Sequence, residues 1–515
     1  MRTLQRLGAT KPYMIVCLFA VAAGSCSNDA DNCETTKTCQ PPPDAQGGDS
    51  GGTGGDGGTC DSTKTPSEDP CVIEDSYGVF VSPTGSDTAN GKKSAPYKTI
   101  GRALAAAKGA AKRVYVCEGT YTEAVTIDTA VDGAQIFGGF DCTTWSYGSA
   151  NSPVVKPSSG VALMLKGLTS GATIEDLEFD APNATTPGAS SIAALSDTST
   201  SVVLRRVKLV AGAGADGAPG VNGAKGDDGA MPGVDQQGKS ATCAADAGAL
   251  QNGGIWPSAV CGSRGGGGGT AFQGGPGGTG VAGTPVMNMN GGPISGDGQK
   301  GADGASAANG APGAAGGTFS AMGYTPAPAG GDGANGNPAQ GGGGGGASSA
   351  TGPMSMSCLG ASGGAGGMGG CGGKLGTGGG SGGASIALLS WQSAITLDSC
   401  RLTAGRGGAG GKGGDGGPGG LGKPGAAGGS GLVNGSDTIA KGGNGGPGGN
   451  GSTGGAGAGG SGGPSYALVY KGTKPTGSST TFTPGTGGSA GPGGTGAAKA
   501  PDGASGPSSS EFAVP

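Results

Sequence analysis

Histidine is absent from all 515 residues of this chain. Without an imidazole, the Ser–His and Cys–His pairs that activate catalytic nucleophiles are excluded, and a zinc site would depend on cysteine and carboxylate ligands alone. The cysteines show no C-x-x-C spacing, so we expect no metal site and no cofactor. Lysines and arginines form no basic patch, and nucleic acid is therefore not an expected partner.

Aromatic and charged residues are also scarce, at 4% and 13% of the chain. Apolar residues concentrate at about 77–210, 384–404 and 464–484, and a conventional core is expected only there. The chain instead contains 127 glycines, a composition typical of disordered segments. Two observations oppose disorder: the glycines are periodic, and the net charge of −5 is small for this length. Disorder driven by charge repulsion is therefore not indicated.

The N-terminus is typical of an export signal. Basic residues precede an apolar run at 14–23 that is too short to span a membrane permanently. Residues 23–26, Ala-Gly-Ser-Cys, resemble the lipobox of bacterial lipoproteins. That resemblance implies cleavage after residue 25, a lipid on Cys26, and a location at the outer membrane or cell surface. The alternative is an ordinary secretory signal, and in either case we expect the chain to be exported.

Export permits disulfides. Cys17 lies in the signal and Cys26 is the expected lipidation residue, so eleven of the 13 cysteines remain. Connectivity does not follow from sequence alone, and pairing of neighbours is the simplest arrangement. It leaves Cys400 as a free thiol. The expected pairs are Cys33 with Cys39, Cys60 with Cys71, Cys117 with Cys142, Cys243 with Cys261, and Cys358 with Cys371.

A template of two short apolar strands occurs three times, and each copy begins with a serine. Ser191 is followed 18 residues later by Leu209, and the copies that begin at Ser385 and Ser465 have a spacing of 17. Long glycine-rich inserts enter at the same point of each copy. Repeated units of this kind stack into quasi-one-dimensional folds. We therefore expect the inserts to leave side by side from one edge of a stack and to return near their exits.

The inserts, at about 212–383 and 405–463, contain Gly-Gly-x triplets. A polyproline II helix has three residues per turn, so two glycines per turn leave two faces bare for contact with neighbouring helices. The runs 265–269 and 341–346 are glycine throughout. These inserts are similar to the polyglycine II bundles of glycine-rich antifreeze proteins and phage-tail adhesins. A flexible linker is the alternative.

Three segments near the N-terminal apolar region carry a more specific resemblance. Residues 79–87 (VFVSPTGSD), 96–100 (PYKTI) and 114–121 (VYVCEGTY) resemble the start of right-handed parallel β-helix proteins of the pectin-lyase-like superfamily. The resemblance implies an all-β fold, a right-handed parallel β-helix with an N-terminal capping helix, to which the polyglycine II-like lobes are added. The apolar spacing from Ile100 predicts the capping helix, with Thr99 as N-cap. The superfamily includes lyases, hydrolases, adhesins and inert scaffolds, so the fold does not select an activity.

These patterns divide the chain into eight segments. They are the signal peptide 1–25, an acidic Gly/Pro-rich linker 26–76, the β-helix cap and first rungs 77–211, a glycine-rich insert 212–383, a rung 384–404, a second insert 405–463, a last rung 464–486, and a glycine-rich C-terminal tail 487–515.

Three six-residue segments align as successive rungs: 174–179, 204–209 and 397–402. Their first, fourth and sixth residues should face the core, where Cys400 would act as a small hydrophobe. Stacked rungs lie roughly 4.8 Å apart, so the second residues, Glu175, Arg205 and Asp398, should form an outward ladder of alternating charge. That ladder is a possible ligand face. The alternative is that it only stabilises the stacking, and we assign no catalytic residue.

Three further segments match the consensus sequences of known sites but lack other features that those sites require. Residues 233–240 fit the phosphate-loop pattern but lack the strand before and the helix after it. Residues 410–415 begin like a calcium-binding nonapeptide, yet Gly417 occupies its apolar position. Gly214 to Gly229 form six collagen-like triplets, which are too few for a triple helix.

We therefore expect an exported surface lipoprotein with a structural or adhesive role in the cell envelope or matrix. The first alternative is a polysaccharide-binding or polysaccharide-cleaving protein that uses Glu175, Arg205 and Asp398. The second is an ice-binding protein. The expected partners are a membrane, through the lipid anchor, and a polysaccharide or another surface protein.

Overall fold

The computed structural model describes residues 60–244 and 248–515. The chain divides into two units, 1–59 and 60–515, and the second contains the described residues. The expected signal peptide and Cys26 lie outside them. The regular secondary structure is mainly β-strand, with several parallel sheets and one α-helix among the described residues.

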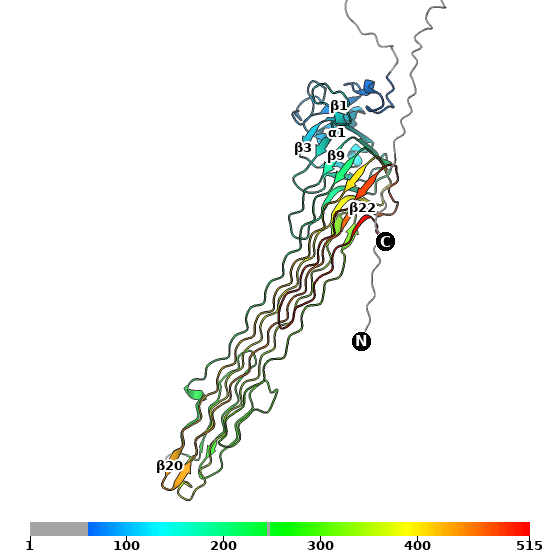
Figure 1. The fold of residues 1–515 in the computed structure, drawn as a ribbon. Coiled ribbons are helices and arrows are strands. Elements are labelled where there is room, and N and C mark those ends of the chain that lie inside the picture. The colour runs from blue at the N-terminus through cyan, green and yellow to red at the C-terminus, as the bar shows by residue number, and fades with distance from the viewer. Residues whose placement is uncertain (1–59, 245–247) are drawn as a thin grey trace, which may run out of the picture. The chain divides into compact units, whose positions relative to one another are not determined.

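Three six-stranded parallel sheets organise the apolar segments, and the chain visits them in turn (Figure 1). Strands that are neighbours in a sheet therefore come from successive circuits of the chain. The first sheet contains β1 (Gly78–Val81), β2 (Arg113–Cys117), β5 (Ala134–Phe140), β8 (Ala172–Glu175), β11 (Val202–Arg205) and β18 (Ile395–Asp398). The second contains β4 (Val125–Ile127), β7 (Leu163–Lys166), β10 (Ser191–Asp197), β17 (Ser385–Trp391), β22 (Ser465–Lys471) and β24 (Ser508–Ala513). The third contains β3 (Gly119–Tyr121), β6 (Pro153–Val155), β9 (Glu178–Asp180), β12 (Lys208–Val210), β19 (Arg401–Thr403) and β23 (Thr481–Thr483).

The core of this three-sheet region consists of apolar side chains from all three sheets. Ile174, Leu204 and Leu397 are partners in register on adjacent strands and are at most 1% exposed. Cys400 is buried and unpaired, and its Sγ lies 3.2 Å from the Leu204 carbonyl oxygen. Burial raises the pKa of the Cys400 thiol to about 11, so the residue packs as a small neutral hydrophobe.

One end of the core is covered by α1 (Ile100–Ala110), which packs against β1 and β2. The helix begins where the Thr99 hydroxyl accepts a hydrogen bond from the backbone N–H of Arg102. Its buried residues, Ile100, Ala103, Leu104 and Ala107, recur at helical spacing and belong to the main core. It ends at Ala111, which has a left-handed conformation.

Four excursions of the chain, three of them glycine-rich, leave after a strand of the third sheet and return at a strand of the second sheet. Where each returns, the first serine of the strand donates a hydrogen bond to a carbonyl at the exit. These bonds join Ser191 to Pro182, Ser385 to Gly212, Ser465 to Gly405 (each 2.7 Å), and Ser508 to Gly485 (2.6 Å). The excursions so closed span 9, 173, 60 and 23 residues. We call this bond the serine clasp; because the four serines are in register, it places all exits along one edge.

The excursions pack together through backbone hydrogen bonds at every third residue. Successive donors 214, 217, 220 and 223 bond to acceptors 406, 409, 412 and 415 at 2.7–2.9 Å. A period of three residues is that of a polyproline II helix. Segments 214–229 and 406–421 run parallel, whereas 408–429 and 362–383 run antiparallel. The inserts therefore share one bundle, which corrects the expectation of separate lobes (Figure 1).

Hydrogen bonds also continue from segment to segment across this bundle. In one layer, N–H groups donate in the order Gly488 to Gly463, Gly463 to Gly408, Gly408 to Gly383, and Gly383 to Ala215. The same order recurs three residues further along each segment, which is roughly 9 Å away at about 3.1 Å per residue. Bonds linked in chains polarise one another, so each layer stabilises its members collectively.

Close approach of these segments requires glycine in the run 341–346. All six residues are buried, and a Cβ on any of them would lie 1.7–2.1 Å from a neighbouring backbone oxygen. Outward-facing positions are filled differently. There, the side chains of Asp216, Asn222 and Asp228 accept hydrogen bonds from backbone N–H groups of the adjacent segment at 2.8–2.9 Å.

Three antiparallel strand pairs complete the bundle: β13 (Leu250–Gln251) with β14 (Ala271–Phe272), β15 (Thr318–Ser320) with β16 (Gly323–Thr325), and β20 (Leu432–Asn434) with β21 (Asp437–Ile439). Single-turn 3-10 helices lie at Pro70–Val72, Thr129–Val131 and Val234–Gln236. The β15–β16 hairpin covers the outer face of the second sheet, where Phe319 packs against Tyr466 and Phe512.

Two domain boundaries differ from the expected ones. Residues 60–76 were expected to be linker but belong to the compact unit, because Val72 and Ile73 are buried and the Tyr115 hydroxyl donates to the Val72 carbonyl. Segment 487–515 was expected to be a tail but forms a further excursion and strand β24, because Ser508 makes the same clasp as the earlier serines.

Four disulfides are present among the described residues. Cys60–Cys71 and Cys117–Cys142 are neighbouring pairs, as expected from the spacing. The expected pairs Cys243 with Cys261 and Cys358 with Cys371 are wrong: the bridges are Cys243–Cys358 and Cys261–Cys371. Each of these joins chain more than 100 residues apart, because the bundle places distant segments side by side.

The remaining expected pair is not among these four bridges. Cys33 and Cys39 both lie outside the described residues, which begin at residue 60. The disulfide expected between Cys33 and Cys39 therefore stays a prediction.

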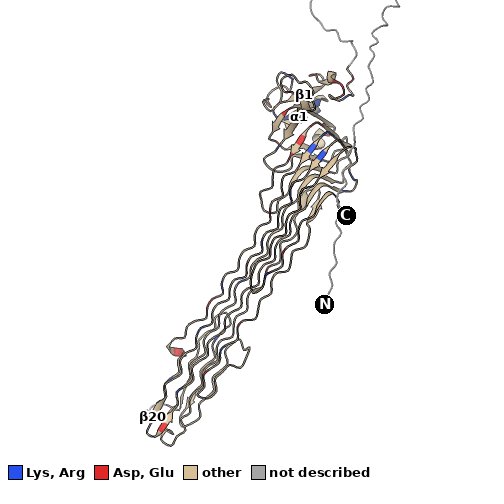
Figure 2. Cartoon of the chain, viewed as in Figure 1, with Lys and Arg blue, Asp and Glu red and all other residues tan. Residues whose placement is uncertain are grey.

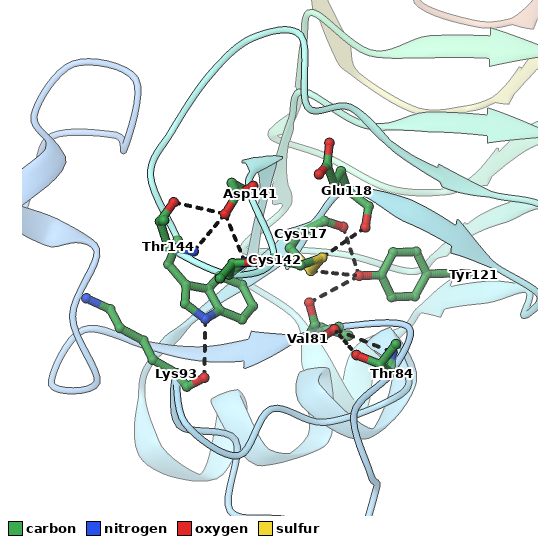
Figure 3. Close-up of a disulfide and its surroundings, with 12 residues drawn as sticks. Val81, Thr84, Lys93, Cys117, Glu118, Tyr121, Asp141, Cys142 and Thr144 are labelled. Atoms are coloured by element: carbon green, nitrogen blue, oxygen red, sulfur yellow. Dashed lines mark hydrogen bonds between the residues drawn. A yellow bond between two sulfur atoms is a disulfide. The ribbon is translucent and has the colours of Figure 1, made fainter.

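The Cys117–Cys142 bridge staples β2 to the chain after β5 (Figure 3). Beside it, the Tyr121 hydroxyl donates to the carbonyls of Cys117 (2.8 Å) and Val81 (3.1 Å). Burial raises the pKa of Tyr121, so the phenol remains a neutral donor. These bonds tie the first circuits of the chain together under the capping helix.

Candidate functional site

The three residues of the expected charge ladder do lie on adjacent strands. Glu175, Arg205 and Asp398 are in register at the ends of β8, β11 and β18. The Nη1 atom of Arg205 lies 2.9 Å from Glu175 Oε1, and its Nε lies 3.7 Å from Asp398 Oδ2. Figure 2 shows both acidic and basic residues on strands of the three-sheet region. The ladder therefore joins three successive circuits by ion pairs.

Glu175 is not an outward residue, contrary to the expectation from its alternation. Its side chain is 1% exposed, because a second guanidinium covers it. Arg206 Nη2 lies 3.0 Å from Glu175 Oε2, and Arg206 Nε lies 2.7 Å from Asp176 Oδ1. The Tyr147 hydroxyl donates to Asp176 Oδ2 at 3.0 Å. Sequence alternation did not identify this second arginine as a partner of Glu175, because Arg206 lies in the turn after β11.

The turn that positions Arg206 recurs in four successive circuits. Asp176, Arg206, Ser399 and Ser479 all have positive φ, between 52° and 60°. Non-glycine residues adopt this left-handed conformation at a cost of roughly 1–2 kcal/mol, so the surrounding contacts must hold it. At Asp176 and Arg206 the mutual ion pair supplies such a contact. This left-handed turn therefore directs one side chain from each of these circuits toward the same side of the stack.

Electrostatics in this cluster, which we call the brace (Glu175, Asp176, Arg205 and Arg206), favour a structural role. Burial raises the pKa of Glu175, and the two arginines oppose that shift. The hydrogen bond with Asp176 raises the pKa of Arg206. Both oxygens of Glu175 and of Asp176 already contact a guanidinium or hydroxyl donor, so neither carboxylate is open for proton transfer to a substrate. Removal of one partner would leave a buried charge uncompensated.

A pocket of about 330 Å³ lies beside the brace. Its charged lining residues are Arg206, Lys208, Arg401 and Asp176, and the Asp176 carboxylate is already paired with Arg206. Ser149, Ser152 and Ser399 add polar side chains. Lys208 lies 3.3 Å from Glu178, whereas Arg401 has no carboxylate within ion-pair distance among the described residues. The pocket can therefore accept an anionic group, with the guanidinium of Arg401 as its most available donor.

Within residues 60–244 and 248–515, one cysteine–aspartate cluster has the spacing of metal ligands, at Cys60, Asp69 and Cys71. The two cysteines form a disulfide, and Asp69 accepts a hydrogen bond from the Cys71 backbone N–H. Without thiolates the cluster does not fit a metal ion. Among the described helices, none has the length and apolar character needed to cross a membrane.

Comparison with known proteins gives one family match. A family model described as "Protein of unknown function (DUF1565)" matches residues 83–169. The matched range contains α1 and strands β2 to β7, and so precedes the brace and the first long excursion. No curated protein and no solved structure matches the chain.

Proposed function

We propose that this chain is an exported surface lipoprotein with a structural or adhesive role. The observation that carries the proposal is the bundle of excursions, which is closed at its base by serine clasps and hydrogen-bonded in repeating layers. A bundle of this construction is suited to bear load or to present a surface at a distance. Charged pairs lie on its outside, such as Lys412–Asp415 at 3.0 Å.

The proposal includes a finer description of the fold. In it, the three-sheet region is a right-handed parallel β-helix capped by α1, and the excursions are polyglycine II-like helices. The order in which the chain visits the three sheets supports the first part. The three-residue period of the hydrogen bonds supports the second.

Anchoring at the membrane rests on the sequence Ala-Gly-Ser-Cys at 23–26. A lipid on Cys26 would attach the chain to the outer membrane or cell surface. The occupied carboxylates of the brace favour a structural role over catalysis in this region. A bacterial surface location and a long glycine-rich bundle together favour contact with a neighbouring surface or matrix.

Cell attachment tests the adhesive role. Cells that lack the chain should bind less to surfaces or to one another than cells that express it, and expression of the wild-type chain should restore the difference. A second strain should carry Gly268→Ala and Gly344→Ala, which place methyl groups 1.9 Å from backbone oxygens inside the bundle. Equal attachment and matrix cohesion in all strains would contradict the proposal.

The pocket beside the brace favours one second candidate, binding of an acidic polysaccharide. Arg401 is the residue that supports it, because its guanidinium forms no ion pair with a carboxylate among the described residues. Arg401→Gln should weaken binding of polygalacturonate at least several-fold, whereas Lys166→Gln, an equal charge change on an exposed residue of the second sheet, should not. Equal effects of the two variants would indicate only general charge attraction.

A further inference from the structure

The end of the bundle remote from the three sheets is built from four chain segments, which we call the tip: 248–251, 271–275, 352–359 and 432–439. The label β20 marks it in Figure 1. The Cys243–Cys358 bridge staples it, and Gln273 Nε2 donates to the Ser357 carbonyl at 3.2 Å. Asp437 Oδ2 accepts hydrogen bonds from the backbone N–H of Met354 and the hydroxyl of Ser355. The tip is therefore an ordered part of the bundle.

Large apolar side chains gather at this tip and are exposed. The exposed fractions are 50% for Leu250, 43% for Phe272, 54% for Met354, 69% for Met356 and 70% for Val433. Leu250 and Phe272 are cross-strand partners, and Gln273 pairs with Leu359 in the segment that carries both methionines. Met354 contacts the turn after β20 through Ser436, 3.8 Å from its sulfur. Monomeric proteins rarely expose apolar groups that cluster in this way unless the cluster binds something.

We propose that the tip inserts into an uncharged lipid surface. The inference rests on the proposed adhesive function and names its partner: the apolar phase of a facing membrane with zwitterionic headgroups. Asp437 is the one charged residue in the described tip segments, and both of its bonds are internal to the tip. Without a lysine or arginine, the tip has no group that attracts anionic lipid.

The five exposed side chains of the patch are all apolar, which suits a lipid phase. A fluid hydrocarbon phase needs no complementary shape, so each side chain contributes by its own buried area. The flexible methionines at 354 and 356 adapt to such a phase.

The backbone of the tip is also suited to an apolar environment, because many of its N–H and C=O groups are hydrogen-bonded within the protein. Unpaired N–H and C=O groups are costly in lipid. Here β13 pairs with β14, β20 pairs with β21, and Leu359 bridges to both Thr242 and Gln273. Shallow insertion of the side chains therefore exposes few unsatisfied backbone groups to hydrocarbon.

Vesicle binding by the full chain tests this inference. All proteins carry Cys26→Ser so that no lipid of their own attaches them. The chain that carries only Cys26→Ser, the wild type of this assay, should cosediment with phosphatidylcholine vesicles, and added phosphatidylglycerol should not increase binding. Combined Leu250→Ser, Met356→Ser and Val433→Ser should lower the partition coefficient by about tenfold or more, because apolar area gives the binding free energy.

A matched triple variant controls for nonspecific binding by exposed apolar residues elsewhere on the chain. Val221→Ser, Met322→Ser and Leu421→Ser change equally exposed apolar residues (69%, 93% and 51%) outside the tip and should bind like wild type. Hydrogen exchange of bundle amides should show that both triple variants remain folded. Absence of wild-type binding, or equal losses in both triples, would overturn the inference.

Two further outcomes distinguish lipid insertion from self-association of the chain and from the proposed adhesive function. Self-association that the tip variant abolishes, without vesicle binding by wild type, would replace the lipid with a second copy of the chain and overturn the inference. Vesicle binding that depends on the tip, in a protein whose loss leaves cell attachment unchanged, would support the inference and contradict the adhesive function.

Discussion

A single methyl group should distinguish the two faces of one glycine run. A Cβ on Gly268 would lie 1.9 Å from the Gly363 carbonyl oxygen, and one on Gly266 would lie 1.8 Å from the Val281 oxygen. Ordinary contact begins at 3.4 Å, so the neighbouring segment would have to move by about 1.5 Å. On Gly267 the nearest atom is Ile255 Cγ2 at 3.4 Å, and a methyl fits without movement.

The free-energy difference follows from these distances. Overpacking in a tight interior costs about 1–3 kcal/mol, and each backbone hydrogen bond lost costs about 0.5–1.5 kcal/mol. Gly266 alone makes two such bonds at 2.8 Å, with Gly342 and Gly366. We expect Gly266→Ala and Gly268→Ala to destabilise the bundle by about 2–4 kcal/mol. Gly267→Ala should be neutral, or stabilising by about 0.4–1 kcal/mol, because alanine restricts the unfolded chain.

Hydrogen exchange followed by mass spectrometry measures this difference segment by segment. Peptides from 254–269, 341–347 and 362–367 should lose protection in the two clashing variants, whereas peptides from the three-sheet region should not change. Equal exchange in the 266, 267 and 268 variants would refute the reasoning. So would a wild-type protein whose bundle amides exchange as fast as unstructured peptide, because the layered hydrogen bonds would then be absent.

Three further expectations concern the anchor, the clasp and the outward carboxylates. Cys26→Ser should move the chain from the membrane fraction to the medium, and retention with membranes would place the anchor elsewhere. Ser385→Ala should cost about 1 kcal/mol through loss of the bond to Gly212, visible as a lower unfolding midpoint, whereas Ser385→Thr should cost less. Backbone N–H groups lower the pKa values of Asp303 and Asp415. These groups therefore stabilise the bundle above the ordinary aspartate pKa near 4, and melting temperature should fall as pH drops below it. Asp303→Asn, which retains the acceptor oxygen, should reduce that pH dependence, and an unchanged profile would contradict the assignment.

The cysteines and the charge ladder show which contacts could be predicted from the sequence and which could not. Neighbour pairing matched the structure at Cys117 and Cys142, because that bridge closes one circuit. It failed for Cys243 and Cys261, since chain that is close in sequence separates onto different bundle segments. Alternation placed Glu175 on the outer side of its strand. It did not reveal that Arg206, held at a left-handed corner, covers that carboxylate.

What the sequence by itself determined is local and periodic. The first, fourth and sixth positions of the aligned rungs predicted the buried residues, the serine spacing aligned the repeated circuits, and the Gly-Gly-x period predicted the three-residue repeat of hydrogen bonds in the excursions. Each follows from the geometry of a few consecutive residues. Only the tertiary structure decided that the excursions share one bundle, which cysteines meet, and which apolar side chains gather at the tip. These features depend on contacts between residues more than 100 positions apart, and a bare glycine backbone carries no local signal for its partner.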